Sequence, residues 1–430
     1  MVSLSFPQFH FHLFLIISGL GVISTVESKT HWGDAQVLKE LKNKIDPSSL
    51  TPGSCVSSWN FTVDPCDNLF TEKFTCGFRC DSVVSGLSRV TELSLDQAGY
   101  SGSLSSIFWN LPYLETLDVS NNYFSGQIPE SFSNLTRLSR LSLSRNSFTG
   151  EIPSSLGSLS MLEELYLDNN NLEGTIPESF NNGLKTLKRL EIQFNNLNGE
   201  LPKNFDSLKN LNYLDLSDNG VTGKLPEALP EFLVQISMRN NSLSGYLQPE
   251  SFTKLKYLEV LDLSYNNFSG SVPFSLFQIP SLEQLTLSFN KFSSMNLASR
   301  YALDYLQSGL IAVDLSNNEI EGFLPMFLAM MPKLASLSME NNKLSGMIPT
   351  QFALKTVLPE PGVSPFERLL LGGNYLFGGI PSPLMALKPG SANVRLVGNC
   401  LYRCPLIFFF CQGGNQKSYQ ECKRFGHFIP

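Results

Sequence analysis

Histidine is almost absent from this chain. Its 430 residues include four, and outside the first 28 residues only His31 and His427 remain, at opposite ends of the sequence. A Ser-His-Asp or Cys-His catalytic group therefore cannot form within the body of the chain. No phosphate-binding loop or set of kinase motifs is present. A carboxylate pair such as Glu164 with Asp168 would suit a glycosidase, but such residues are better explained as the polar surface of a sheet. We predict no enzymatic activity, no cofactor and no metal site.

Cysteine is missing from the whole middle of the sequence, between Asp81 and Asn399. Its eight residues form two even groups at the two ends, which indicates disulfides formed in an oxidising compartment. Zinc binding is the alternative, because two of the spacings are close to those of metal ligands, but the secretory features below favour disulfides. The pairing within each group stays open. The cysteines are Cys55, Cys66, Cys76, Cys80, Cys400, Cys404, Cys411 and Cys422.

Positive charge is scarce as well. The formal net charge is −7, 16% of the residues are charged, and no run of Lys or Arg occurs. These features argue against a nucleic-acid or lipid-surface partner. Sequons of the Asn-x-Ser/Thr type predict N-glycosylation, and hence a secreted protein, at Asn60, Asn134, Asn240 and Asn267.

The N-terminus has the proportions of a secretory signal. Residues 9–23 are almost wholly apolar, and small and polar residues follow them up to Ser28. This apolar core is too short for a comfortable membrane span. We predict a signal peptide over residues 1–28, cleaved near Ser28, with an uncleaved anchor as the alternative.

A repeat fills most of the remaining chain. The pattern L-x-x-L-x-L-x-x-N-x-L-x-G-x-I-P returns about every 24 residues, for example as LETLDVSNNYFSGQIP and LSRLSLSRNSFTGEIP. The twelve repeats begin at Val90, Leu114, Leu138, Leu162, Leu187, Leu211, Leu233, Leu258, Leu282, Leu310, Leu334 and Phe366.

Each recurrent place has a physical reason. The first, fourth and sixth places point inward from a short strand, so the residues between them point outward. The ninth place is Asn in eleven repeats, where a buried amide can satisfy backbone groups as the chain leaves the strand. Gly at the thirteenth place permits a left-handed backbone, and Ile-Pro favours an extended segment. One repeat cannot bury its own leucines, so the repeats must stack into a curved solenoid with a parallel sheet on its concave side.

The Gly-x-Ile-Pro form of this repeat resembles the plant extracellular leucine-rich repeat class, which includes receptor-like kinases, receptor-like proteins and polygalacturonase inhibitors. Residues 34–66 resemble that family's N-terminal cap, with a helix started by Asp34 and the motifs Ser-Trp-Asn and Asp-Pro-Cys. The Phe-Phe-Phe-Cys-Gln block is similar to the ends of small kinase-less members. Apolar residues at helical spacing would cover the first repeat: Val37, Leu38, Leu41 and Ile45.

The resemblance implies an α/β solenoid, a right-handed leucine-rich repeat superhelix with a parallel β-sheet on the concave face and disulfide-stabilised caps. We predict a helical, disulfide-bonded N-terminal cap over residues 29–86. About twelve repeats follow over 87–393, and a C-terminal cysteine cap occupies 394–430.

The outward residues of successive strands offer an extended binding surface. From the third repeat to the seventh they combine guanidinium groups with aromatic rings, the residue types that dominate recognition sites. This patch would suit an acidic peptide terminus or a uronic-acid glycan, while ordinary solvation of the concave face is the alternative. Tyr265 and Phe289 occupy outward places in later repeats. The candidate ligand-binding residues are Arg140, Arg145, Tyr166, Arg189, Glu191, Phe194, Tyr213 and Arg239.

Two repeats depart from the pattern. The ninth runs on through residues 293–309, and the eleventh carries an insertion over 351–368. Such insertions map to loops on one edge of a solenoid and often contact a partner; a tolerated surface insertion is the alternative. Pro359, Pro361 and Pro365 would stiffen the second insertion.

The apolar run PLIFFF, residues 405–410, could begin a membrane anchor or close the end of the core. Its six residues fall far below the length of about 20 that spans a bilayer, Cys411 interrupts it, and a polar tail follows. Because a terminal repeat needs a cap, we predict that Phe408, Phe409 and Phe410 form a plug held by the cysteines.

By resemblance, the predicted function is recognition of a peptide, glycan or protein ligand at the plant cell surface or wall. The protein would be extracellular, in the apoplast or at the outer face of the plasma membrane, and would act in defence or developmental signalling through a partner receptor kinase. The alternatives are a polygalacturonase-inhibitor-like inhibitor of microbial wall-degrading enzymes and a structural wall protein.

Overall fold

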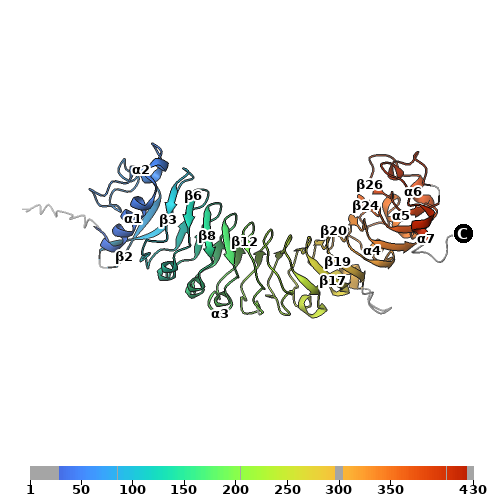
Figure 1. The fold of residues 1–430 in the computed structure, drawn as a ribbon, viewed down its shortest axis with the longest axis horizontal. Coiled ribbons are helices and arrows are strands. Elements are labelled where there is room, and N and C mark those ends of the chain that lie inside the picture. Colours follow the sequence, from blue (N-terminus) through green and yellow to red (C-terminus); the bar gives the residue numbers. More distant parts are fainter. Residues whose placement is uncertain (1–28, 85, 204, 296–303, 403, 424–430) are drawn as a thin grey trace, which may run out of the picture.

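The protein forms an elongated arc of stacked coils with a cap at each end (Figure 1). The computed structural model describes residues 29–423 except residues 85, 204, 296–303 and 403. The predicted signal peptide therefore lies outside the described residues. Within them, no helix is long and apolar enough to cross a membrane.

A 15-stranded sheet lines the concave side of the arc (Figure 1). Its strands follow one another in chain order and pair in parallel, except that β2 runs antiparallel to β3. Equivalent places of successive repeats lie opposite each other, so Leu117 is in register with Leu141 and Leu141 with Leu165. The strands are β1 (Lys29–Thr30), β2 (Phe78–Val84), β3 (Leu87–Ser94), β5 (Thr116–Asp118), β7 (Arg140–Ser142), β9 (Glu164–Tyr166), β11 (Arg189–Glu191), β13 (Tyr213–Asp215), β14 (Gln235–Ser237), β16 (Val260–Asp262), β18 (Gln284–Thr286), β20 (Ala312–Asp314), β22 (Ser336–Ser338), β24 (Arg368–Leu370) and β26 (Asn393–Arg395).

Shorter sheets run along one flank, built from the segments that follow the recurrent Asn. Between β12 and β15 single backbone bonds continue this ladder, for instance from the Thr222 N–H to the Gly199 carbonyl at 2.7 Å. The strands are β4 (Ser101–Ser103), β6 (Tyr123–Gly126), β8 (Ser147–Glu151), β10 (Asn171–Gly174) and β12 (Asn196–Leu197), then β15 (Ser244–Tyr246), β17 (Asn267–Val272) and β19 (Lys291–Met295), then β21 (Glu321–Phe323), β23 (Lys343–Gly346), β25 (Tyr375–Gly378) and β27 (Cys400–Leu401).

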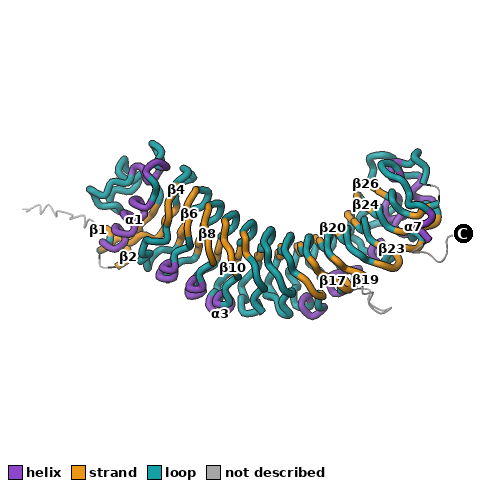
Figure 2. The backbone as a smooth tube through the Cα atoms, in the orientation of Figure 1, coloured by secondary structure: helices purple, strands orange, loops and turns teal. Residues whose placement is uncertain are grey.

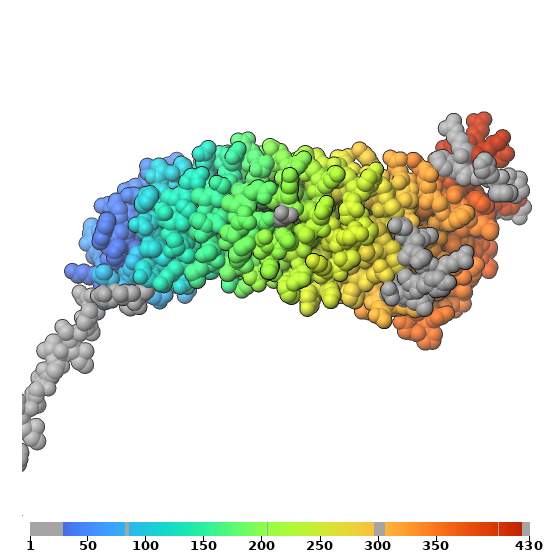
Figure 3. All heavy atoms as spheres, turned by 90° about the horizontal axis from the view of Figure 1, so that it is seen from below, coloured from blue at the N-terminus to red at the C-terminus, as the bar shows by residue number. Residues whose placement is uncertain are grey.

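Helical turns cover the ends and the convex side, which Figure 2 shows in purple along the lower edge of the arc. Figure 3 looks onto that side, where the coils lie next to one another in chain order. The α-helices are α1 (Trp32–Lys44), α2 (Cys55–Ser58), α3 (Ser179–Gly183), α4 (Phe327–Met330), α5 (Thr350–Val357), α6 (Ser382–Met385) and α7 (Tyr419–Lys423). The 3-10 helices are η1 (Pro47–Ser49), η2 (Glu130–Asn134), η3 (Ser154–Ser158), η4 (Pro249–Phe252), η5 (Phe274–Gln278), η6 (Asp304–Gln307) and η7 (Phe409–Cys411).

The inward residues make one continuous core along the arc. Leu117, Leu141 and Leu165 are completely buried, and the buried cluster extends from Val37 in the N-terminal cap to Cys411 in the C-terminal cap. Burial of this apolar surface is the main force that holds the short strands together. The predicted solenoid with a parallel concave sheet is confirmed.

The recurrent Asn performs the backbone role that the sequence predicts. Asn170 donates to the carbonyls of Leu143 and Leu167 at 3.0 and 3.1 Å, and its Oδ1 accepts from the Phe148 N–H at 3.0 Å. Asn399 makes equivalent bonds after β26, accepting from the Leu376 N–H at 3.1 Å. The stack therefore contains a thirteenth strand and turn, where the sequence pattern shows only the start of one.

The N-terminal cap is joined to the first repeat through a buried acid. Helix α1 begins at Trp32, with the His31 side chain accepting from the Gly33 N–H, so it starts two residues before the predicted Asp34. Asp34 is instead fully buried and accepts from Arg89 Nε and Nη2 at 2.9 and 2.8 Å and from the Val90 N–H at 2.9 Å. Three of the predicted apolar residues, Val37, Leu38 and Leu41, lie on this helix and Ile45 follows its end, and all four are buried against the core.

Disulfides close both ends of the chain. Cys55 pairs with Cys76 and Cys66 with Cys80 in the N-terminal cap, while Cys400 pairs with Cys422 and Cys404 with Cys411 in the C-terminal cap. These pairs resolve the connectivity that the sequence leaves open.

The three phenylalanines of the predicted plug differ in how deeply they are buried. Phe410 is buried and its backbone carbonyl accepts from the Leu396 N–H at 2.9 Å, whereas Phe408 and Phe409 are half-buried and pack against it. Leu406 and Ile407 of the same apolar run face outward and are 67% and 84% exposed. Only the last part of the run therefore covers the core.

The insertion over 351–368 is only partly a loop. Its first half belongs to helix α5, where Phe352 is buried and stacks on Phe366 with ring centroids 6.0 Å apart. This half is part of the packed body rather than an edge loop. In the ninth repeat, residues 296–303 of the predicted extension lie outside the described residues.

Candidate functional site

All eight predicted ligand-binding residues lie on strands of the concave sheet or within three residues after one. Arg140, Tyr166, Arg189, Glu191 and Tyr213 belong to strands β7, β9, β11 and β13. The other three, Arg145, Phe194 and Arg239, follow strands β7, β11 and β14. The structure brings five of the eight into two side-chain clusters, and each cluster spans neighbouring strands.

The first cluster joins the third and fourth repeats. Arg140 forms an ion pair with Glu164 and lies over the Tyr166 ring, with its guanidinium carbon 4.6 Å from the ring centroid. The Tyr166 hydroxyl in turn donates to Glu164 at 3.1 Å. Arg140 and Glu164 remain 41% and 37% exposed, so a ligand can reach both charged groups.

The second cluster joins the fifth and sixth repeats and also combines an arginine, a glutamate and a tyrosine, but here the glutamate is on the same strand as the arginine. Arg189 donates through Nε to Glu191 at 2.7 Å and lies 3.6 Å from the centroid of the Tyr213 ring. Gln193 donates to the other Glu191 oxygen at 3.1 Å. The Gln193 Oε1 atom is buried and accepts no hydrogen bond from any described residue. A buried acceptor of this kind normally has a donor, so the second cluster contains one hydrogen-bond acceptor that is not satisfied by the described residues.

These two groups, called the paired clusters below, set the charge of the surface. Burial opposes the charge of Arg140, but the neighbouring Tyr166 and Glu164 outweigh it and raise the pKa of Arg140. Burial also raises the pKa of the Tyr213 hydroxyl, with a further contribution from Glu191 and Asp215. Both guanidinium groups are already paired with a carboxylate. An incoming anion must compete with Glu164 or Glu191.

Several concave strands end in an Asp, namely Asp118, Asp215, Asp262 and Asp314, and the structure gives this residue a role in the turn that follows. Asp215 accepts through Oδ1 from the Ser217 N–H at 2.9 Å and from its hydroxyl at 2.6 Å, which closes the turn after β13. Burial raises the pKa of Asp215, although these two bonds lower it. Asp118, Asp262 and Asp314 accept from the Ser N–H two residues later in the same way, so these carboxylates shape the ends of their strands.

One residue of almost every repeat, at the eighth place, adopts a left-handed backbone. In ten repeats φ at this place lies between 52° and 56°, and six of the residues are Asn or Asp, which tolerate this conformation. The other four are bulky: Arg145, Phe194, Tyr265 and Phe289. A left-handed backbone costs a residue of this kind about 1–3 kcal/mol. We call these ten residues the left-handed row.

Two aromatic residues of the left-handed row stack on each other. The Tyr265 and Phe289 rings are nearly parallel, with centroids 4.1 Å apart, and remain 41% and 42% exposed. Arg239, from the preceding repeat, lies over Tyr265 at 5.2 Å. Aromatic stacking contributes about 0.5–1.5 kcal/mol, which is less than the combined backbone strain of the two residues. Sequence periodicity places these rings one repeat apart, but it does not show that they touch.

The predicted glycosylation acceptors occupy different parts of the surface. Asn240 and Asn267 are exposed, whereas Asn60 and Asn134 are half-buried. Asn240 belongs to the left-handed row and donates to Asp218 at 2.7 Å. It therefore lies on the rim of the same concave face as the candidate site.

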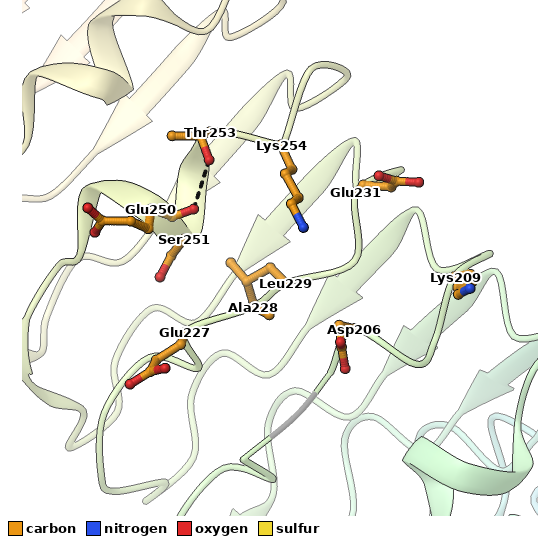
Figure 4. Close-up of a pocket in the computed structure, with 10 residues that line it drawn as sticks. All are labelled: Asp206, Lys209, Glu227, Ala228, Leu229, Glu231, Glu250, Ser251, Thr253 and Lys254. Carbon is orange, nitrogen blue, oxygen red and sulfur yellow. Dashed lines mark hydrogen bonds between the residues drawn. The ribbon is translucent and has the colours of Figure 1, made fainter.

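A hollow of about 480 Å³ lies away from the concave sheet, in the segments that follow Pro202, Pro226 and Pro249 of the fifth to seventh repeats (Figure 4). Its charged residues are mixed in sign: the carboxylates of Asp206, Glu227, Glu231 and Glu250 line it together with Lys209 and Lys254 (Figure 4). Its buried Ser251 hydroxyl is already satisfied by the Pro226 carbonyl at 3.3 Å. The hollow offers no convergent set of unpaired groups among the residues that line it, so the concave face is the better candidate.

Comparison with known proteins identifies the repeat as a leucine-rich repeat. A leucine-rich repeat family model matches residues 88–148, 112–172, 160–221 and 233–292. A probable leucine-rich repeat receptor-like serine/threonine-protein kinase of Arabidopsis thaliana is 33% identical over an alignment of 97 residues that covers 19% of this chain and 9% of that protein.

Solved plant receptor structures share the fold. The plant peptide hormone receptor RGFR1, in complex with RGF2, is 29% identical with a TM-score of 0.65, covering 72% of this chain and 48% of that one. The ectodomain of the Arabidopsis receptor kinase HAESA, in complex with an extended IDA peptide hormone, is 28% identical with a TM-score of 0.63, covering 86% and 62%. A TDR receptor is 28% identical with a TM-score of 0.59, covering 71% and 55%. The chain thus spans less than two thirds of each of these proteins.

Proposed function

Since this chain is a leucine-rich repeat protein of the plant extracellular type, we propose that it is a secreted recognition protein whose concave face binds a ligand at the plant cell surface or wall. The ligand is a peptide, glycan or protein, and a peptide is favoured because the similar RGFR1 and HAESA ectodomains are solved with peptide hormones. The chain would act in defence or developmental signalling by presenting the ligand to a partner receptor kinase.

The observation that carries this proposal is the preorganisation of the paired clusters. Each guanidinium is held over a tyrosine ring and against a carboxylate, on strands whose register is fixed by the sheet. A ligand therefore meets side chains that are already ordered, which reduces the entropy lost on binding. Arg and Tyr in such partly desolvated clusters are the residues that most often dominate binding energy.

The test is affinity capture from apoplastic fluid and solubilised plant membranes with the whole secreted chain. Replacing Arg140, Arg145 and Arg189 together by Gln should remove the captured ligand and leave the fold unchanged, because all three side chains lie outside the core. Loss of a charged hydrogen bond at each position corresponds to about tenfold or more in affinity.

Arg137 provides the matched control. It is exposed and lies 4.3 Å from the centroid of the Tyr113 ring, so it has the same contact with tyrosine but is not part of a concave strand. Arg137→Gln should capture the ligand normally. Equal capture by the triple variant and the unchanged chain would refute the paired clusters as the binding site.

A further inference from the structure

We propose that Arg239, Tyr265 and Phe289 form a second subsite, the aromatic shelf, that binds an acidic side chain of an extended peptide together with the apolar side chain beside it. The proposal rests on the proposed function, because it takes the concave face as the recognition surface. The shelf occupies the seventh to ninth repeats, beyond the paired clusters of the third to sixth.

The backbone fixes the direction of both rings. The Tyr265 N–H donates to the Ser288 carbonyl at 2.9 Å, and the Phe289 N–H donates to the Ser316 carbonyl at 3.0 Å. These bonds between repeats hold φ at 54° for both residues. The two rings are exposed and lie outside the core. The backbone of both residues is left-handed, a conformation that strains an aromatic residue and that Asn adopts in other repeats. Strain retained in exposed residues indicates a use other than folding.

Charge indicates the class of ligand. Arg140 and Arg189 are each paired with a glutamate, but among the described residues no hydrogen bond or ion pair engages the Arg239 side chain. The Tyr265 hydroxyl is likewise without a partner in the described part of the chain. A guanidinium and a phenol hydroxyl side by side can both donate to one carboxylate. The open edges of Tyr265 and Phe289 supply an adjacent apolar surface.

The stacking favours a peptide over a sugar. Arg239 comes from the repeat before Tyr265 and Phe289 from the repeat after it, so they cover opposite faces of the Tyr265 ring. A pyranose ring would need one of those faces free. Ring edges with neighbouring donors instead suit the side chains of an extended peptide, whose residues repeat at about 3.3 Å along the strand direction.

The experiment measures binding of short synthetic peptides to the whole chain by isothermal titration calorimetry. The peptides are acetylated and amidated, so their only charge is one glutamate, which precedes a phenylalanine in a Gly/Ser background. We expect the Glu-Phe peptide to bind at least about tenfold more tightly than the matched Gln-Phe or Glu-Ala peptides. Arg239→Gln, and the double variant Tyr265→Asn with Phe289→Asn, should remove that preference.

Asparagine is chosen because it fits the left-handed backbone, so the double variant should keep its circular dichroism spectrum and melt no lower than the unchanged chain. Tyr257→Asn is the control, since Tyr257 also stacks, on Phe232 with centroids 5.6 Å apart, but is not in the left-handed row. It should bind the Glu-Phe peptide normally.

Several outcomes would overturn the shelf. The unchanged chain could fail to bind the Glu-Phe peptide, or it could bind the Gln-Phe peptide equally well. It could also bind an oligogalacturonide, with only the shelf variants losing that binding. If the shelf variants bind the Glu-Phe peptide and capture the natural ligand normally, while the triple variant of Arg140, Arg145 and Arg189 captures no ligand, the shelf fails and the proposed function survives.

Discussion

Lys355 is a buried cation in helix α5 with no carboxylate partner in the described residues. Its side chain is 4% exposed, its Nζ donates to the Met331 carbonyl, and it lies 4.8 Å from the centroid of the Phe366 ring. Burial lowers the pKa of Lys355 from 10.5 to about 8. The sequence does not reveal that Lys355 is buried, because a lysine on an amphipathic helix ordinarily extends to solvent.

This shift makes stability depend on pH in one direction. Between pH 8 and 10.5 the unfolded chain holds a proton on Lys355 that the folded chain has released, so the free energy of unfolding rises with pH across this interval. Relative to a Lys355→Met variant, the unchanged chain should gain at most about 3 kcal/mol over that range. Chemical denaturation of both proteins at several pH values measures the difference. A constant difference from pH 7 to 11 would show that Lys355 titrates normally.

At the scale of elements, the contact between α1 and β3 depends on the ion pair of Asp34 with Arg89. Asp34 is fully buried, the Arg89 side chain is 12% exposed, and the same carboxylate accepts from the Val90 N–H. Removing one partner of a buried pair leaves the other charge without compensation.

Asp34→Asn should therefore destabilise the N-terminal cap by about 3–5 kcal/mol. All three tryptophans lie in the cap or the first repeat, as Trp32, Trp59 and Trp109, so fluorescence reports on this end of the chain. Lys39→Gln, an exposed change on the same helix, should alter stability by less than about 0.5 kcal/mol. If both variants unfold at the same urea concentration, the ion pair does not hold the cap.

The elements themselves were largely predictable, because the inward leucines and the recurrent Asn repeat at a fixed period. The sequence pattern did not predict the thirteenth strand as a full repeat, because Val394 and Leu396 are followed by cysteines instead of the rest of the repeat. Helix α5 was missed because its residues interrupt the period. For the candidate site, the sequence predicts on which face of the solenoid the residues lie but not which side chains touch. Whether Arg140 pairs with Glu164 depends on side-chain positions across two strands, which spacing does not determine.

At the scale of the whole molecule, each coil contacts mainly its neighbours, so unfolding can begin at either end. The C-terminal end is held by two disulfides that close loops of different lengths, with sequence separations of 22 residues for Cys400–Cys422 and 7 for Cys404–Cys411. The longer loop restricts the unfolded chain more.

Replacing Cys400 and Cys422 by Ser should thus cost about 1 kcal/mol more stability than replacing Cys404 and Cys411. Urea unfolding followed by circular dichroism measures both losses. Tryptophan fluorescence, which reports on the opposite end, should change at the same urea concentration in both variants and in the unchanged chain. A larger loss from the shorter loop would show that packing of the phenylalanine plug, rather than chain entropy, dominates.

The left-handed row also bears on how such a surface can change. Backbone bonds between repeats set the conformation at this place, and the side chain contributes nothing to the core, as the exchange among Asn, Asp, Arg, Phe and Tyr shows. A substitution here alters what the concave face offers to a ligand while the scaffold keeps its shape. New specificity could therefore be engineered in this protein one residue per coil, with asparagine as the neutral starting point at each position.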